Sequence, residues 1–140
     1  RQALGRIVFN DAAAREILNA ITHPRIRDKV LERLQDLRKD DPDAVVVIEA
    51  PLLIEAGMEK IVDAVWVVTA PEKVRLKRLM ERDNLSWQEA QSRLWAQMGE
   101  GERLRHATRV IPTGGDLAAT RASVLAAWQE LRRQGDSHVK

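Results

Sequence analysis

Two carboxylates flank a proline-leucine turn in the stretch AVVVIEAPLLIEAG, which covers residues 44–57. Glu49 directly follows a short apolar, mostly β-branched run, and Glu55 comes after the turn. Such a run is typical of a buried strand in a parallel sheet, and ligands bind at the carboxyl ends of these strands. Glu49 therefore stands where a phosphotransferase can hold a carboxylate near a magnesium ion. The alternative, for both glutamates, is a side chain that faces solvent or pairs with an arginine.

A basic segment in the second half of the chain is the other group of residues suited to chemistry. Its members are Arg75, Lys77, Arg78, Arg82, Arg93, Arg103, Arg105 and Arg109. A guanidinium group binds phosphate oxygens bidentately and keeps its charge at all working pH values. Arg78 and Arg82 are four residues apart, so they share one helix face. Two interpretations stay open: a phosphate clamp, or a solvated helix face balanced by nearby acids.

His23 precedes Pro24 and is a candidate base or ligand. Without a second histidine or an acid at metal-ligand spacing, the pattern favours a histidine packed between helices. A phosphate-binding loop of the form G-x-x-x-x-G-K-[ST] would hold phosphates with backbone amides and a lysine. The sequence contains no Gly-Lys pair, so this loop is absent from it.

The overall composition excludes several classes of protein. Lys and Arg total 23 against 21 acidic residues, and this weak imbalance does not favour a nucleic-acid-binding protein. The absence of cysteine excludes disulfides and cysteine zinc sites and fits a reducing compartment, so we expect a cytoplasmic location. No apolar run approaches the roughly 20 residues that a membrane-spanning helix needs. Because the chain begins with Arg1, in what reads as the middle of an element, we expect further sequence before it.

Apolar periodicity predicts two helices in the first part of the chain. Asn10 or Asp11 can cap the first helix. The Thr-His-Pro sequence at residues 22–24 is expected to break it, with the proline in the first turn of the second helix. A polar loop at residues 39–43 is expected to follow.

Helices and strands alternate in the rest of the chain. Strands are predicted at residues 44–48, 64–69 and 109–111, because each is short, apolar and rich in β-branched residues. Capping-box patterns at residues 69–72 and 86–89 predict two helices, and a last helix follows the turn at residues 113–116. This order indicates an α/β fold with a parallel sheet.

Taken in order, several short motifs resemble the dephospho-coenzyme A kinase family over almost the whole chain. Residues Leu18 to Ile26 resemble the family element "L-x-x-I-x-H-P-x-I", and Glu49 to Glu55 resemble "D-[IV]-P-L-L-[FY]-E". Arg78 with Arg82-Asp83 resembles "Q-x-x-R-x-x-x-R-D", and Arg93 with Gln97 resembles "R-x-x-x-Q". The resemblance implies a P-loop-kinase-like, three-layer parallel sheet, here incomplete, with helical coenzyme-binding and lid insertions. It also implies transfer of the γ-phosphoryl group of ATP, with Mg²⁺, to the ribose 3′-hydroxyl of dephospho-coenzyme A.

The resemblance also suggests roles for residues and segments. It places the coenzyme-binding helices in residues 1–43, and the sheet remainder in residues 44–140 with a lid helix at about 84–100 and a C-terminal helix. Arg93 is the expected catalytic residue, since an arginine on the lid can neutralise charge in the transition state. The expected acceptor-binding residues are His23, Glu49, Pro51, Leu52, Leu53 and Glu55; Arg82 and Gly115 are expected at the nucleotide, and no residue is expected to ligate metal.

The sequence departs from the family pattern at three places. It lacks the phosphate loop, and position 49 carries Glu where the family commonly has Asp. In the late element "A-D-x-V-I-x-N-x-G", Thr108 replaces the Asp and Thr113 replaces the Asn. We therefore expect this chain alone to be inactive. Three alternatives remain: another small-molecule kinase resembling nucleoside monophosphate kinases, a degenerate ligand-binding paralogue, or a chain that self-associates through an exposed sheet edge.

Overall fold

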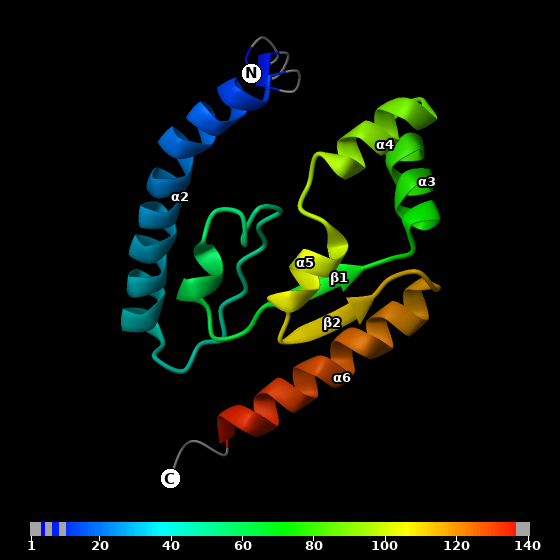
Figure 1. Ribbon diagram of the computed structural model, residues 1–140. Coiled ribbons are helices and arrows are strands. Elements are labelled where there is room, and N and C mark those ends of the chain that lie inside the picture. Colours follow the sequence, from blue (N-terminus) through cyan, green and yellow to red (C-terminus); the bar gives the residue numbers. More distant parts are fainter. Residues whose placement is uncertain (1–3, 5–6, 9–10, 137–140) are drawn as a thin grey trace. The chain divides into compact units, whose positions relative to one another are not determined.

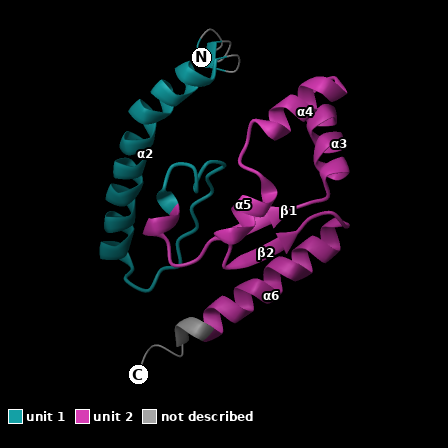
Figure 2. Ribbon diagram, in the orientation of Figure 1, with its two compact units in different colours: residues 1–58 teal, residues 59–140 magenta. Residues whose placement is uncertain are grey.

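A computed structural model describes residue 4, residues 7–8 and residues 11–136, with side chains as far as Arg133. The chain divides into two compact units, residues 1–58 and residues 59–140 (Figures 1 and 2). Each unit is described by itself. The boundary between them falls later in the chain than the polar segment that ends at Asp43. None of the helices in the described residues is long and apolar enough to cross a bilayer.

One long helix, α2 (Ala12–Asp40), forms most of the first unit (Figure 1). Asp11 caps it as predicted, because its Oδ1 accepts a hydrogen bond from the Ala14 amide at 3.0 Å. The other candidate cap, Asn10, lies outside the described residues. The predicted break at residues 22–24 is wrong, since Pro24 lies inside the continuous helix.

The helix continues through Pro24 because only one backbone donor is lost there. Proline has no N–H for the carbonyl four residues before it, and its ring crowds that carbonyl. Near this point the Thr22 hydroxyl donates to the Leu18 carbonyl at 2.8 Å, a bond that occurs only on a helical backbone. Helix-forming residues on both sides supply enough further hydrogen bonds to keep one helix.

The predicted strand at residues 44–48 is also wrong: residues 44–50 form neither a strand nor a helix. A strand is held by hydrogen bonds to a neighbouring strand, and the described part of the first unit supplies none. The apolar side chains of this segment consequently stay accessible, with Val47 82% exposed. The composition of the segment is typical of a strand, but a strand also needs a neighbouring strand to bond with.

Parallel strands β1 (Trp66–Thr69) and β2 (Arg109–Pro112) form the sheet of the second unit, as predicted in type and place. Trp66 pairs with Arg109 and Thr69 pairs with Pro112. Val67 and Ile111 point to opposite faces of this pair, because Val67 is opposite Val110 and neighbouring residues alternate. Both are buried, so each face of the sheet carries packed side chains.

Helices α3 (Glu72–Asp83) and α4 (Trp87–Trp95) follow β1 and pack against each other (Figure 1). The capping box predicted at residues 86–89 is confirmed, with Ser86 and Glu89 bonded to each other's backbone amides. The one predicted at residues 69–72 is wrong. Pro71 is the N-cap of α3 and makes no side-chain cap bond.

Two further helices complete the second unit. The short helix α5 (Glu100–Arg105), which the sequence analysis does not predict, contacts β1. Helix α6 (Leu117–Asp136) lies along β2, and the predicted turn before it is confirmed by Asp116, whose Oδ1 accepts from the Ala119 amide at 2.7 Å. Because the chain crosses from β1 to β2 through α3, α4 and α5, the two strands run parallel.

Candidate functional site

Two of the predicted phosphate-binding arginines meet on one carboxylate. Arg82, near the end of α3, donates from Nε and Nη2 to the two oxygens of Asp83, at 2.8 and 3.1 Å. Arg93, on α4, donates from Nη1 to Asp83 Oδ2 at 2.9 Å. The Asp83 side chain is 25% exposed, whereas that of Arg82 is 73% exposed. The structure therefore gathers two cations around one partly covered anion.

The backbone between α3 and α4 brings these arginines together. Asn84 ends α3 in the left-handed conformation, with φ of 50°, a geometry that asparagine tolerates better than most residues. Ser86 then starts α4 two residues later, and its capping box with Glu89 fixes the first turn. This tight turn lets α4 pack against α3, and Arg93 reaches Asp83 ten residues earlier in the chain.

Asp83 and Arg82 each stabilise the charged form of the other. Hydrogen bonds from Arg82 hold the pKa of Asp83 below its ordinary value of 3.8, with charge attraction to Arg82 and Arg93 acting in the same direction and burial opposing it. The same bond to Asp83 raises the pKa of Arg82. Asp83 is consequently an anion at any neutral pH, with two guanidinium groups on it.

A third arginine, Arg78, forms hydrogen bonds to the turn that contains Gly115. Arg78 donates to the Thr113 hydroxyl at 3.3 Å and to the Thr113 carbonyl at 2.6 Å. Thr113 in turn donates from its amide and its hydroxyl to the Thr69 carbonyl, at 2.7 and 3.0 Å. The turn at residues 113–115 therefore lies at the carboxyl ends of both strands, the edge at which ligands bind in parallel sheets.

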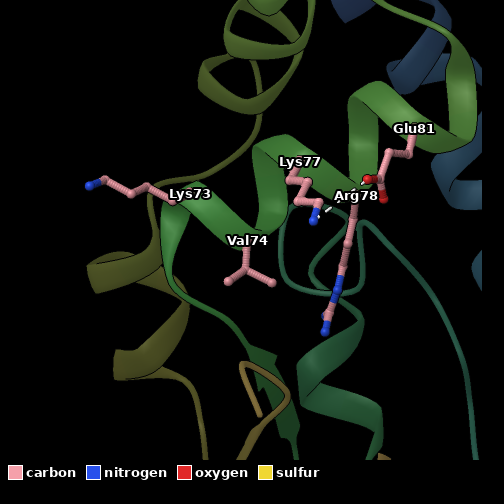
Figure 3. A pocket seen from close by; sticks show the side chains of 5 residues that line it. All are labelled: Lys73, Val74, Lys77, Arg78 and Glu81. Carbon is pink, nitrogen blue, oxygen red and sulfur yellow. Dashed lines mark ion pairs between the residues drawn. The ribbon is translucent and has the colours of Figure 1, made fainter. Parts of the chain in front are cut away.

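Beside this turn, the exposed surface of α3 contains an open hollow (Figure 3). Its lining residues are Lys73, Val74, Lys77, Arg78 and Glu81. Lys77 and Glu81 form an ion pair at 3.8 Å, while Lys73 extends away from them. Except for Val74, the lining side chains are exposed, so the hollow is a basic stretch of helix surface and has no enclosing wall.

The predicted acceptor-binding residues of the motif lie together in the first unit. After Glu49, which is exposed, the chain makes a compact helical turn in which the Leu53 amide bonds to the Ala50 carbonyl and the Ala56 amide to the Leu52 carbonyl. Gly57 ends this turn with φ of 65°. Pro51, Leu52 and Glu55 are exposed, and Leu53 is half-buried. The motif thus presents a carboxylate at each end and apolar side chains between them.

His23 lies on α2 and is half-buried. It belongs to the first unit, like the motif, whereas Arg82, Arg93 and Gly115 belong to the second. The predicted site residues therefore fall into two groups, one in each unit. Within the second unit the two arginines are brought together, and Gly115 lies on the turn held by Arg78.

No three His, Cys, Asp or Glu side chains among the described residues gather in a way that could hold a metal ion. Magnesium bound to a nucleotide keeps several waters and uses few protein ligands. No residue in the described part of the chain is therefore assigned to Mg²⁺.

The sequence analysis did not identify the roles of Asp83 and Thr113. Asp83 reads as one more acid within a helical motif, and only the turn at Asn84 shows that it faces a second arginine. Thr113 reads as a departure from the family pattern. In the structure its hydroxyl donates to the Thr69 carbonyl and accepts from Arg78. A hydroxyl group can do both, because it has one hydrogen to donate and lone pairs to accept with.

Thr108, the other departure, also fits its place. The Val65 amide donates to its hydroxyl at 3.0 Å, and the hydroxyl lies 3.0 Å from the Val65 carbonyl. A hydroxyl can serve both backbone groups, whereas an ionised carboxylate can only accept. Thr108 therefore extends the β1–β2 ladder by one position before β2 begins.

The dephospho-CoA kinase family model matches residues 1–119 of this sequence. The chain belongs to the dephospho-CoA kinase family. Among similar proteins, the dephospho-CoA kinase of Moorella thermoacetica is 74% identical over 133 residues, covering 95% of this chain and 63% of that protein. The dephospho-CoA kinase of Symbiobacterium thermophilum is 44% identical over 129 residues, covering 92% of this chain and 54% of that protein.

Solved structures agree with this family assignment. A dephospho-CoA kinase from Campylobacter jejuni matches with a TM-score of 0.66 and 37% identity, covering 96% of this chain and 66% of that one. The crystal structure of TT1252 from Thermus thermophilus matches with a TM-score of 0.73 and 36% identity, covering 94% of this chain and 66% of that one. The predicted α/β, P-loop-kinase-like fold is thereby confirmed. The chain spans less than two thirds of the length of these relatives.

Proposed function

We propose that this chain supplies the acceptor-binding, lid and C-terminal parts of an enzyme that transfers the γ-phosphoryl group of ATP to the 3′-hydroxyl of dephospho-CoA, giving CoA in the last step of its synthesis. Family membership supports the reaction. The observation that carries the proposal is the pair of arginines from α3 and α4 on Asp83. Phosphoryl transfer depends on positioned cations that neutralise phosphate charge.

We assign the nucleotide to the second unit. Arg82 and Arg93 would contact its phosphates, with Arg93 as the residue that stabilises charge in the transition state. The turn containing Gly115 would lie beside the nucleotide, because Arg78 and Thr69 fix that turn at the carboxyl ends of the strands. ATP is the expected phosphoryl donor, and Mg²⁺ would reach the site with it; no residue described here is assigned to the metal.

We assign dephospho-CoA to the first unit. The turn at residues 50–57 exposes Leu52 between the carboxylates of Glu49 and Glu55, a surface suited to a ligand with polar and apolar parts. His23 and α2 would bind another part of the same ligand. A cytoplasmic location fits a chain without cysteine that acts on soluble metabolites.

A hybrid enzyme tests the proposal. In it, this chain replaces the matching segment of the 74% identical M. thermoacetica protein, which supplies the rest of the kinase length. We expect ATP-dependent phosphorylation of dephospho-CoA and at least about 100-fold lower kcat/KM for AMP, a difference of about 3 kcal/mol. A folded hybrid that is inactive, or that prefers AMP, would contradict the proposal.

The 140-residue chain itself should transfer no measurable phosphate, because its sequence contains no G-x-x-x-x-G-K-[ST] loop to hold the nucleotide phosphates. The assay is the same as for the hybrid, with the isolated chain in its place. Robust turnover by the isolated chain would show that another part of it holds the phosphates.

A further inference from the structure

We propose that Asp83 is a positioning residue that holds Arg82 and Arg93 ready to engage one phosphate chain together. The proposal rests on the proposed function, which assigns both arginines to phosphates. It adds a role for an acidic residue that would itself repel the ligand. The role follows from three hydrogen bonds to one carboxylate, two from Arg82 and one from Arg93.

Arg82 and Arg93 contact the same carboxylate from two neighbouring helices. The guanidinium group of Arg82 donates to both oxygens of Asp83, and Arg93 donates to Oδ2 from the neighbouring helix. Two guanidinium groups on one carboxylate cannot be far apart, since each lies within about 3 Å of it. Asp83 therefore determines the spacing of the two cations as well as their orientation.

The bonds to Asp83 also limit the conformational freedom of the arginine side chains. Arginine has a long side chain, and ordering it in a complex costs affinity that a side chain ordered beforehand does not lose. The expected difference is about two- to tenfold in affinity for each arginine that must be immobilised on binding. Arg82 is mostly exposed, so without Asp83 little of the described packing would restrain it.

The negative charge of Asp83 has the opposite effect on phosphate affinity. A carboxylate near a phosphate weakens binding, and removing one unit charge about 4 Å away in an exposed site strengthens it by about fivefold. Charge alone therefore predicts that a variant lacking Asp83 binds phosphate more tightly. Positioning predicts weaker binding, so the sign of the change separates the two explanations.

The experiment titrates the 140-residue chain with inorganic tripolyphosphate by calorimetry, at about 0.15 M salt, where charges are screened beyond about 8 Å. We expect Asp83→Ala to weaken binding by about threefold or more, and Asp83→Asn to weaken it less, since it keeps one acceptor oxygen. Glu81→Gln removes a carboxylate of the same helix that pairs with Lys77 instead, and should leave the affinity unchanged or slightly tighter.

A second control separates positioning from helix stability. Ser86→Ala removes the capping box of α4 without touching the three bonds to Asp83, so it should lower Tm and leave tripolyphosphate affinity within twofold. Tighter or unchanged binding by Asp83→Ala, undetectable binding by the unmodified chain, or equal weakening by Ser86→Ala would each overturn the proposal. Because dephospho-CoA is absent from this titration, its outcome is independent of the hybrid-enzyme assay.

Discussion

Gly114 shows how one residue allows two segments to meet at the ends of the strands. A Cβ atom at this position would lie 2.6 Å from Cδ and 3.2 Å from Cγ of Pro71, the residue that starts α3. The proline ring is rigid and cannot move aside as a long side chain could. The neighbouring Thr113 is already fixed to Thr69 and Arg78, so the turn has little room to shift.

Gly114→Ala should therefore destabilise the second unit by about 1–3 kcal/mol, the usual range for forcing an atom into a packed site. Urea unfolding measures the change. Gly101→Ala is the matched control, because nothing lies within 4 Å of its added Cβ and it lies in helix α5, where alanine is favoured by about 0.5–1 kcal/mol. Equal effects of the two substitutions would show that the contact with Pro71 does not restrain the turn.

The secondary-structure elements differ in how far sequence alone predicts them. The capping box at residues 86–89 is local, so its four residues suffice to predict the start of α4. Residues 44–48 carry the composition of a strand, but a ladder requires a partner that composition does not reveal. Pro24 suggests a helix break that does not occur, because the other hydrogen bonds of the helix stabilise it more than the one missing bond destabilises it. Helix α5 is too short to show periodicity.

The candidate site shows the same difference between local and distant information. Motif order indicates Arg82 and Arg93 as phosphate-binding residues, but it does not show that they share Asp83. That contact depends on the turn between α3 and α4, which is a property of backbone geometry at Asn84. Likewise, Thr113 stands where the family commonly has Asn, and the sequence does not reveal its bonds to Thr69 and Arg78.

The capping box of α4 should make its stability depend on acid pH. The Ser86 hydroxyl and then its backbone amide donate to Glu89, which lowers the pKa of Glu89 below its ordinary value of 4.5. A lowered pKa in the folded state stabilises the fold above the unfolded-state pKa. This contribution is lost as the pH falls through the folded-state pKa, so α4 should loosen below pH 4.5.

Amide hydrogen exchange in α4, followed as the pH is lowered from 6 to 3 and corrected for the intrinsic exchange rate, measures this dependence. Protection should fall less steeply in Glu89→Gln, which has no carboxylate to protonate, and in Ser86→Ala, which lacks the hydroxyl donor. If all three proteins lost protection in parallel, the acid sensitivity would have to come from other groups, such as Asp83, whose pKa is also lowered.

At the scale of the whole molecule, the two-stranded sheet of the described second unit leaves strand edges without a neighbouring strand. Val68 on β1 is 60% exposed, and Val110 on β2 is 43% exposed. An apolar strand with an open edge is a template for pairing with another chain. We expect the 140-residue chain to self-associate at high concentration, as its sequence suggests.

Sedimentation velocity at increasing protein concentration tests this expectation, and Val68→Lys should shift the chain towards the monomer because a charge on an edge strand opposes pairing. Leu117→Lys is the matched control: it charges another accessible apolar residue, 83% exposed, on helix α6 instead of the sheet. A monomer at all concentrations, or equal effects of the two variants, would exclude self-association through β1.

The parallel pairing of β1 and β2 also has a consequence for the order in which the second unit folds. The contact between Val65 and Thr108 spans 43 residues, whereas α3 and α4 meet across a short turn. Closing the longer loop takes more chain entropy before any ladder bond forms, and distant contacts slow folding. The α3–α4 pair should therefore assemble early, and docking of β2 onto β1 should limit the folding rate.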